Sequence, residues 1–241
     1  IAASEAAAFA AALRIFLVGL PAIQEHWTTV FVALAVITMT FGNVTAIVQT
    51  NMRRMLAYSA VAQAGYVMVG LAVASERAVS AMIYYLIAYA FATIGAFAVV
   101  ILLGRYHPAE DIADYRGLGR RAPLLALTLT VFMLSFIGIP PTAGFFGKFY
   151  LFQSAVAAGM PWLALIMVLN SMVSIPYYWG VVQTMYLREG ETDAPLPAPA
   201  GVRWTAAIGL AATLILGLFP DQVVQLVSAV QVVPALLSGG L

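Results

Sequence analysis

The amino-acid sequence predicts an all-α integral membrane protein with about seven transmembrane helices. Hydrophobic residues make up 63% of the 241 residues and charged residues only 9%, whereas an ordinary soluble domain carries about 25% charged residues. Apolar stretches recur along the chain, each close to the roughly 20 residues that a helix needs to cross the hydrocarbon core of a bilayer. These two observations exclude a soluble globular protein.

The same composition excludes several classes of function. The net charge of +1 provides no basic surface for nucleic acid. The chain has no cysteine, so it can form neither disulfides nor thiolate or iron–sulfur sites. Its two histidines, His26 and His107, fall in polar connecting segments. We therefore expect no cofactor and no metal site in this chain.

The apolar runs and the polar segments between them predict the elements in order. Transmembrane spans are expected at about 3–20, 28–48, 55–74, 78–104, 122–156, 161–187 and 202–219. The remaining segment, 220–241, places Gln222, Gln225 and Gln231 among valines and leucines, which predicts an interfacial or subunit-packing helix. A disordered tail is the alternative for this segment.

The first span contains a single carboxylate. Glu5 stands among small apolar residues in IAASEAAAFAAALRIF. It is therefore either buried in the membrane, where ionisable residues usually have a function, or close to the cytoplasmic edge. We keep Glu5 as a candidate proton-carrying residue, with the edge position as the alternative.

Polar groups recur along the third span at positions that roughly share one face of a helix. They are Tyr58, Ser59, Gln63 and Tyr66. Their hydroxyl and amide groups could hold water between charged sites. The alternative is that they only join neighbouring helices, through hydrogen bonds worth about 0.6 kcal/mol each.

The fourth and sixth spans carry weaker versions of this pattern. The residues are Tyr84, Tyr85 and Tyr89 in the fourth span, and Ser171, Ser174, Tyr177 and Tyr178 in the sixth. Small residues also recur in the fourth span, at Ala88, Ala92, Gly95 and Ala96. This second pattern predicts a seam of close helix packing.

The fifth span is too long for one straight crossing. It covers about 35 residues, against the roughly 20 that are needed, and Gly138, Pro140, Pro141 and Gly144 lie at its middle. Proline removes a backbone donor and clashes with the preceding turn, so we expect a helix broken at Gly138–Pro141. Interrupted backbone at this depth is tolerated only where it is buried in protein or lines a hydrated cavity, and in transporters such breaks mark ion sites.

The only lysine of the chain, Lys148, follows this break by about two helical turns. The ten other basic residues are all arginine. An ammonium near the bilayer centre costs on the order of 2.5–3.5 kcal/mol. A buried lysine can release and take up a proton, whereas a buried arginine stays charged. We therefore predict a proton-relay role for Lys148, with a lysine that snorkels to the interface as the alternative.

The arginines predict the orientation of the chain, because basic residues concentrate in cytoplasmic loops. If alternate connections share a side, one side holds Arg14 and Arg77 and the other holds eight arginines. The eight are Arg53, Arg54, Arg105, Arg116, Arg120, Arg121, Arg188 and Arg203. We expect the arginine-rich loops in the cytoplasm and, with an odd number of spans, the C-terminus on the outer side.

Three motifs carry a family resemblance. In order, they are NVTAIVQTNMRRMLAYSAVAQAGYVMVGLAV, DIADYRGLGRRAPLLALTLTVFMLSFIGIPPTAGFFGKFYLF and NSMVSIPYYWGVV. Together they closely resemble the antiporter-like membrane subunit N (subunit 2) of respiratory complex I, the NADH-quinone oxidoreductase, including its chloroplast and cyanobacterial relatives. The resemblance covers nearly the whole chain and is weakest toward its C-terminus.

This resemblance implies the second half of an inverted-repeat antiporter-like fold. Lys148 matches the family's lysine on the second broken helix, which is thought to pass protons outward. Gln63 stands where related antiporter-like subunits often carry histidine. At the place of Glu5 the family normally has lysine. A carboxylate can also carry a proton, but its charged form has the opposite sign, so the electrostatic coupling along the chain has to differ.

The resemblance also implies a setting. The chain would be a subunit of a proton-translocating NADH:quinone oxidoreductase, with no redox centre of its own and with FMN, iron–sulfur clusters and quinone in other subunits. Its partners would be antiporter-like and small membrane subunits and the lipid bilayer. The membrane would be a bacterial inner (plasma) membrane or a thylakoid-type membrane.

The leading hypothesis is a proton half-channel around Lys148, bordered by the broken helix and by Glu5, Gln63, Tyr58, Ser59 and Tyr66. Two alternatives stay open. The first is a subunit of a related Na⁺(K⁺)/H⁺ antiporter or of a membrane-bound hydrogenase. The second is a structural subunit that does not pump.

Overall fold

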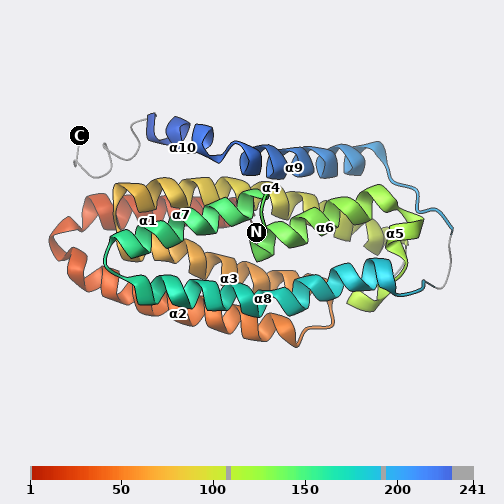
Figure 1. Ribbon diagram of the computed structural model, residues 1–241, viewed down its shortest axis with the longest axis horizontal. Coiled ribbons are helices and arrows are strands. Elements are labelled where there is room, and N and C mark those ends of the chain that lie inside the picture. Colours follow the sequence, from red (N-terminus) through yellow and green to blue (C-terminus); the bar gives the residue numbers. More distant parts are fainter. Residues whose placement is uncertain (1, 107–109, 191–193, 230–241) are drawn as a thin grey trace.

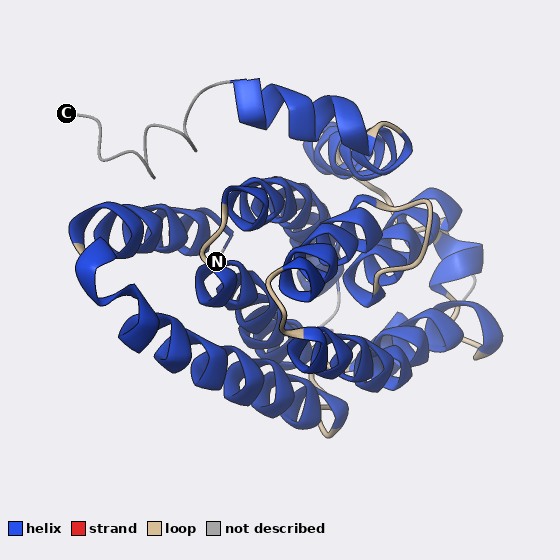
Figure 2. Ribbon diagram, turned by 60° about the vertical axis from the view of Figure 1, so that its left-hand side comes forward, coloured by secondary structure: helices blue, strands red, loops and turns tan. Residues whose placement is uncertain are grey.

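The computed structural model describes residues 2–106, 110–190 and 194–229, and these residues form a bundle of helices without a β-strand (Figures 1 and 2). The α-helices are α1 (Ala2–Leu13), α2 (Gln24–Ile47), α3 (Met52–Val73), α4 (Glu76–Tyr106), α5 (Leu118–Arg121), α6 (Pro123–Ile137), α7 (Ala143–Ala157), α8 (Pro161–Leu187), α9 (Ala200–Leu218) and α10 (Pro220–Ala229). The shorter elements are the π-helix η1 (Arg14–Gly19) and the 3-10 helices η2 (Pro21–Ile23) and η3 (Ile112–Tyr115). The all-α prediction is confirmed.

Five helical segments have the length and apolar character needed to cross a membrane. They are Pro21–Ile47, Met52–Val73, Glu76–Arg105, Pro161–Leu187 and Ala200–Leu218, and they correspond to the second, third, fourth, sixth and seventh predicted spans. The predicted first span is α1 continued by η1, and the predicted fifth span is α6 followed by α7. His26 is exposed in the first turn of α2, whereas His107 lies outside the described residues.

Local sequence signals set several helix ends. Pro123 and Pro161 are the first residues of α6 and α8. A proline costs nothing there, because the first backbone N–H groups of a helix have no partner within the helix. Asn51 precedes α3, and its side chain accepts a hydrogen bond from the backbone N–H of Arg54 at 3.0 Å. These residues begin the helices near the ends that the hydropathy pattern predicts.

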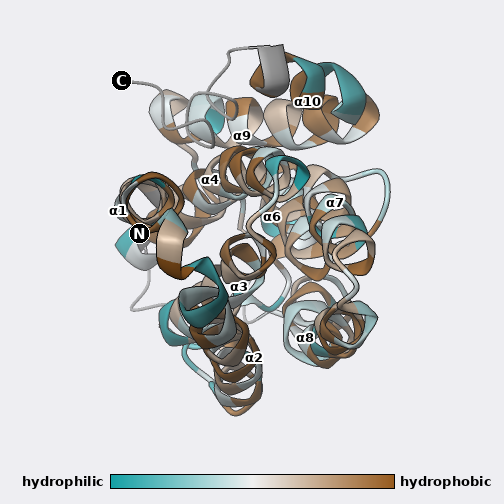
Figure 3. Cartoon of the chain, turned by 90° about the vertical axis from the view of Figure 1, so that its left-hand side faces the viewer, coloured by the Kyte–Doolittle hydropathy of each residue, from teal (hydrophilic) through white to brown (hydrophobic). Residues whose placement is uncertain are grey.

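Helix α4 lies inside the bundle and contacts α1, α3, α6, α7, α9 and α10. On one side of it, α9 and α10 form an outer edge. On the other side, α3 and the α6–α7 pair separate it from α2 and α8 (Figures 1 and 3). Within the predicted small-residue seam, a Cβ atom built on Gly209 of α9 would lie 3.3 Å from the Cα atom of Gly95. The close packing predicted for α4 is therefore found against α9.

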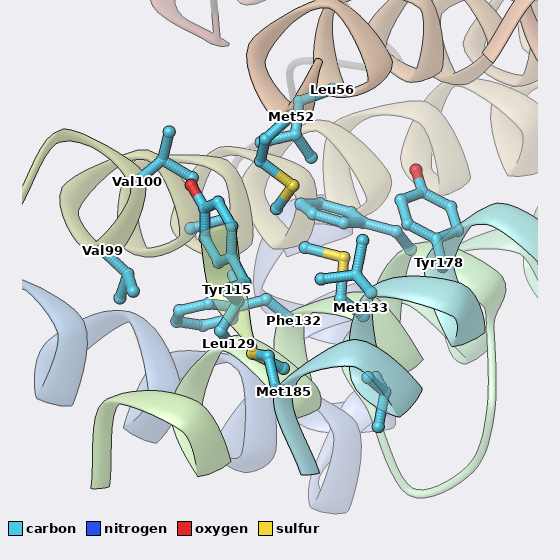
Figure 4. Packing of buried hydrophobic residues seen from close by; sticks show 14 of the residues in the cluster. Met52, Leu56, Val99, Val100, Tyr115, Leu129, Phe132, Met133, Tyr178 and Met185 are labelled. Carbon is cyan, nitrogen blue, oxygen red and sulfur yellow. The ribbon is translucent and has the colours of Figure 1, made fainter. Parts of the chain in front are cut away.

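Two apolar clusters fill the interior. The first joins α3, α4, α6 and α8 and is shown in Figure 4; its labelled members are Met52, Leu56, Val99, Val100, Tyr115, Leu129, Phe132, Met133, Tyr178 and Met185. The second joins α1, α2, α3, α4, α7 and α8. Ile137, at the end of α6, belongs to the first cluster, and Tyr66 of α3 belongs to the second. The broken helix thus lies where the two clusters meet.

Large apolar side chains are also exposed on outer faces of the bundle. On α2 they include Val30, Leu34, Ile37, Phe41 and Val44, and on α8 they include Leu165, Leu169 and Met172. A soluble monomer rarely exposes contiguous apolar surface of this kind. The arrangement is that of an integral membrane protein, as the composition predicts.

The described part of the predicted C-terminal interfacial segment is helix α10. Its Val223 and Val224 pack against Tyr84 and neighbouring residues of α4, whereas Gln222 and Gln225 are exposed. Residues 230–241, including Gln231, lie outside the described residues.

Candidate functional site

The break predicted at Gly138–Pro141 separates α6 from α7. Helix α6 ends at Ile137, and Gly138 follows in the left-handed region with φ 90°. A cis peptide bond joins Pro140 to Pro141, and α7 begins at Ala143. Gly144 lies in the first turn of α7, where a Cβ atom would be 1.9 Å from the backbone oxygen of Ser135. A glycine at this position therefore allows the two half-helices to touch.

The two half-helices cap each other across the break. The backbone N–H of Gly144, at the start of α7, donates to the hydroxyl oxygen of Ser135 at 3.1 Å. In return, the Nζ atom of Lys148 on α7 donates to the carbonyl oxygens of Phe136 at 2.8 Å and Ile137 at 3.1 Å. A helix end leaves such groups without partners in the helix, and its C-terminal end favours a cation. The break itself thus supplies the acceptors for the lysine.

Two further groups complete the environment of Lys148. The Nζ atom donates to the hydroxyl oxygen of Ser171 on α8 at 3.0 Å, and it lies 4.4 Å from the centre of the Tyr66 ring. An ammonium group has three hydrogen-bond donors and no acceptor, so all three donors are used here. The side chain is 8% exposed and is directed into the bundle. It does not snorkel to the surface.

Gln63 shares an acceptor with the lysine. Its Nε2 atom donates to the Phe136 carbonyl oxygen and to the hydroxyl of Tyr178, both at 3.2 Å. Its Oε1 atom accepts a hydrogen bond from the hydroxyl of Tyr85 on α4. The Phe136 carbonyl therefore joins Lys148 to a buried amide and to two tyrosines from different helices.

Two asparagines that the sequence analysis did not single out form a second polar connection. The buried Asn43 of α2 donates to the hydroxyl of Tyr66 at 3.4 Å and to Oδ1 of Asn170 at 3.2 Å. Its own Oδ1 atom accepts from the hydroxyl of Tyr177 at 2.9 Å, and the rings of Tyr177 and Tyr178 lie 4.3 Å apart. Asn43 and Gln63 are therefore linked to Lys148 through different groups, the Tyr66 ring and the Phe136 carbonyl. The sequence contained a signal for the two asparagines: an asparagine inside an apolar span needs hydrogen-bond partners when its amide is buried.

The remaining predicted residues lie farther from the lysine along the network or outside it. Ser59 is buried and donates to the Leu56 carbonyl oxygen within its own helix at 2.7 Å. Tyr58 is partly exposed and packs edge-to-face against Phe41 of α2, with ring centres 6.5 Å apart. The structure thus brings Gln63 and Tyr66 to Lys148, but it turns Tyr58 toward α2.

Glu5 lies on the opposite side of α4 from this cluster. Its carboxyl group is half-buried on α1, which packs against α4. It is within electrostatic range of Tyr85 and Tyr89, whose rings stack with centres 6.5 Å apart. Tyr85 therefore donates to Gln63 and is also within electrostatic range of Glu5.

A pocket of about 500 Å³ opens beside Lys148, between the helix break and α8. Its lining is largely apolar, with Ile139, Phe149 and Met172 among the walls and Ser171 next to the amine. Within the described ranges, no group of three histidine, cysteine or acidic side chains is placed to hold a metal ion. Of the polar partners of the lysine, Ser171 lies in the wall of this pocket, whereas the Phe136 carbonyl joins the amine to the buried network.

This arrangement can now be compared with known proteins. The sequence family described as "NADH:quinone oxidoreductase/Mrp antiporter, TM" matches residues 1–174. The chain belongs to this family. Within it, the chain is 48% identical over 223 residues to NADH-quinone oxidoreductase subunit N of Trichlorobacter lovleyi, which covers 92% of this chain and 46% of that protein. The resemblance to subunit N is confirmed.

Two further comparisons extend this result. The chain is 44% identical over 237 residues to F(420)H(2) dehydrogenase subunit N of Methanosarcina mazei, covering 93% of this chain and 48% of that protein. Among solved structures, respiratory complex I from Thermus thermophilus with bound aureothin matches with a TM-score of 0.71 and 33% identity, over 82% of this chain and 45% of that one. The chain therefore spans less than half the length of the relatives it matches.

Proposed function

We propose that this chain forms a proton-translocating half of subunit N in an NADH-quinone oxidoreductase, with Lys148 as the group that binds and releases the proton. The proposal rests on one observation: the only lysine of the chain is buried at a broken membrane helix, with its three donors directed at Phe136, Ile137 and Ser171. Helix breaks at membrane depth are where transporters build ion sites. The names of the relatives supply the reaction to which the transfer is coupled.

The geometry around Lys148 couples its protonation to its position. A protonated amine offers three donors, which match the three acceptors. A neutral amine keeps two N–H donors and has a lone pair, which would face an oxygen atom and be repelled by it. Release of the proton therefore removes one of the contacts that hold the side chain in place. Such a group can respond to a change of charge elsewhere in the protein, because its two states favour different arrangements.

We place Glu5 at the other end of the same path. Tyr85 lies between the two sites: its hydroxyl donates to Gln63, and its ring stacks on that of Tyr89, close to Glu5. Proton transfer between Glu5 and Lys148 requires hydroxyl groups or water on this line, since an amide does not readily lose a proton. A negative Glu5 favours a protonated Lys148 across the bundle, whereas a lysine at that position would oppose it.

The orientation follows from the arginines. The arginine-rich connections support an orientation in which α6 would lie on the cytoplasmic side of the break and α7 on the outer side. The amine of Lys148, which α7 carries, would then exchange protons toward the outer side. The chain itself would hold no redox centre, and electron transfer in other subunits would reach it as an electrostatic or conformational signal. Those partners would include other antiporter-like subunits and small membrane subunits, in a bacterial inner or thylakoid-type membrane.

A pair of substitutions in the intact complex tests this function. Lys148→Met removes the titratable group, and Lys148→Arg keeps a permanent positive charge that cannot be released. Both variants are expected to lose proton pumping, measured as protons moved per electron in proteoliposomes, while the complex stays assembled. A Lys148→Arg complex that pumps normally would reject the proton-relay role. An unchanged ratio in Lys148→Met would reject the function altogether.

The electron donors differ among the named relatives. The family description also covers Mrp antiporters, and one relative is a subunit of an F(420)H(2) dehydrogenase. Isolating the chain with its native partners decides between these settings. Hydrophilic iron–sulfur proteins with NADH:quinone activity would support complex I, F420-dependent activity would indicate the dehydrogenase, and the absence of redox subunits would indicate an antiporter.

A further inference from the structure

The corner between α9 and α10, residues 216–221, packs against the second half of the broken helix and against α4. The mechanism proposed above does not use this corner. It lies on the other side of the broken helix from α8, which supplies Ser171 to Lys148 (Figures 1 and 3). Three contacts attach it to the elements that set the position of the lysine.

The first contact is between main chains at the break. A Cβ atom added to Gly217 would lie 2.0 Å from the backbone oxygen of Pro141. It would also lie 2.6 Å from the carbonyl carbon of Thr142 and 2.8 Å from the backbone nitrogen of Ala143. These are backbone atoms, which cannot turn aside as the end of a side chain can. Helix α9 therefore lies directly on the residue where α7 begins.

The second contact ties α9 to α4. The hydroxyl of the buried Tyr84 donates to the carbonyl oxygen of Leu216 at 2.7 Å. This carbonyl is in the last turn of α9, where the backbone oxygens have no N–H partner further along the helix. Tyr84 therefore fixes the end of α9 against the central helix of the bundle.

The third contact lies farther along α7. The hydroxyl of Tyr150 donates to Oδ1 of Asp221, the second residue of α10, at 2.8 Å. The Tyr150 ring also packs edge-to-face on Tyr84, with ring centres 5.5 Å apart and planes at 90°. Helix α7 is thus held at its first residue by Gly217 and at Tyr150 by Asp221. Lys148 lies between these two points in the sequence.

We propose that Gly217 and Asp221 are positioning residues for Lys148, acting through α7. Because residues 138–142 interrupt the helix, α6 does not continue into α7 and cannot by itself fix where the lysine stands. The α9–α10 corner, which holds α7 against α4, sets the distance from Nζ to the carbonyls of Phe136 and Ile137 together with the direct contact of Gly144 with Ser135. This inference rests on the proposed function of Lys148 and assigns a role in it to the last two described helices.

Gly217→Ala in the intact complex is the first test, with Gly201→Ala as its matched control. Both glycines are on α9, but a Cβ atom at Gly201 would meet no atom within 4 Å. A displacement of about 1 Å can cost a reacting group on the order of 100-fold in rate. We expect Gly217→Ala to lower protons pumped per electron by about ten-fold or more, and Gly201→Ala to leave the ratio unchanged. Equal pumping by the two variants would overturn the inference.

The Asp221 contact gives a second test that does not strain the fold, because this residue is exposed. Asp221→Asn keeps the oxygen that accepts from Tyr150, whereas Asp221→Ala removes it. We expect Asp221→Ala to lower the pumping ratio at an unchanged rate of quinone reduction, and Asp221→Asn to restore it. A purely stabilising contact would instead lower the amount of assembled complex and leave the ratio intact. Asp221→Ala with a normal ratio, or Asp221→Asn as defective as Asp221→Ala, would overturn the role of Asp221.

Lys148→Met separates this inference from the function on which it rests. If Lys148→Met pumps normally, the proposed function itself fails. If Lys148→Met abolishes pumping but Gly217→Ala behaves like Gly201→Ala, only the positioning role fails.

Discussion

The two halves of the broken helix contribute different chemical groups to the same contact. Helix α6 supplies the backbone carbonyls of Phe136 and Ile137 and the hydroxyl of Ser135, and it brings no ionisable side chain to the site. Helix α7 supplies the amine of Lys148 and the backbone N–H of Gly144. In a continuous helix, those carbonyls would be bonded to backbone N–H groups in the next turn. The break frees them to accept from the lysine.

This difference shows how a fold can bury an amine in an apolar interior with acceptors from the main chain. Burial of an unpaired charge is costly unless hydrogen bonds replace its hydration. Here two of the three acceptors come from α6 and the amine comes from α7, so the relative position of α6 and α7 strongly affects how well the charge is compensated. Substitutions that separate α6 from α7 should therefore reduce proton pumping most. Substitutions that remove one hydrogen-bond partner of Lys148 should reduce it less.

Gly144→Ala tests the contact between α6 and α7 most directly. The added methyl group would lie 1.9 Å from the backbone oxygen of Ser135 and would force α6 and α7 apart. Overpacking of this kind costs about 1–3 kcal/mol of stability, and we expect pumping to be lost as well. The measurements are thermal stability of the complex and protons pumped per electron. Gly180→Ala on α8, where a Cβ atom meets nothing within 4 Å, is the control, and equal behaviour of the two variants would contradict the role given to the break.

Tyr85→Phe tests whether the path toward Glu5 matters once the halves are in place. The substitution leaves Oε1 of Gln63 without the hydroxyl that donates to it, at a cost of about 1–3 kcal/mol for the unpaired buried acceptor. We expect slower pumping, with little change in assembly. Tyr115→Phe is the control, because the hydroxyl of this buried tyrosine has no hydrogen-bond partner among the described residues. If the turnover-linked proton transfer is the same in both variants, Tyr85 is not on the path.

Ser171→Ala removes one partner of the amine and leaves both half-helices unchanged. One donor of the ammonium group then lacks its acceptor at 3.0 Å; a hydrogen bond to a charged group contributes about 1.5–3 kcal/mol. We expect a partial loss of pumping, smaller than for Lys148→Met. Ser174→Ala is the matched control, since Ser174 donates to the Ser171 carbonyl and does not contact the lysine. A full loss in Ser171→Ala would mean that α8, and not the break, dominates the site.

Tyr58→Phe should have the smallest effect of this series. Tyr58 is on the same helix as Gln63 and Tyr66, but its ring packs on Phe41 at the α2 side. Loss of its hydroxyl is expected to change the free energy of unfolding by no more than about 0.5 kcal/mol, as for surface substitutions in general. The number of protons pumped per electron is expected to stay unchanged. A strong pumping defect would show that the predicted polar face of α3 extends to Tyr58 after all.

The agreement between sequence and structure is closest where a property belongs to one segment of chain. The all-α class, the apolar exterior and the break at Gly138–Pro141 could all be predicted, because hydropathy and proline stereochemistry act locally. Lys148 could be singled out because it is the only lysine and lies in an apolar span. Family membership was also readable, because the motifs occur in order along the chain.

The hydrogen-bond partners of Lys148 could not be predicted from the sequence. Two of its acceptors are backbone oxygens, which every residue possesses and which no sequence pattern marks. The third, Ser171, lies on a separate helix, as do Asn43 and Tyr85 of the surrounding network. The spacing along α3 grouped Tyr58 with Gln63, but helix packing turned the two side chains toward different neighbours.

The sequence by itself therefore determined that a lysine amine would lie beside a broken helix in a membrane. Only the tertiary structure decided which atoms meet that amine and which elements hold it there. The physical reason is that the cost of burying a charge is set by the amine itself, whereas its compensation depends on groups brought together from α3, α6 and α8 by packing.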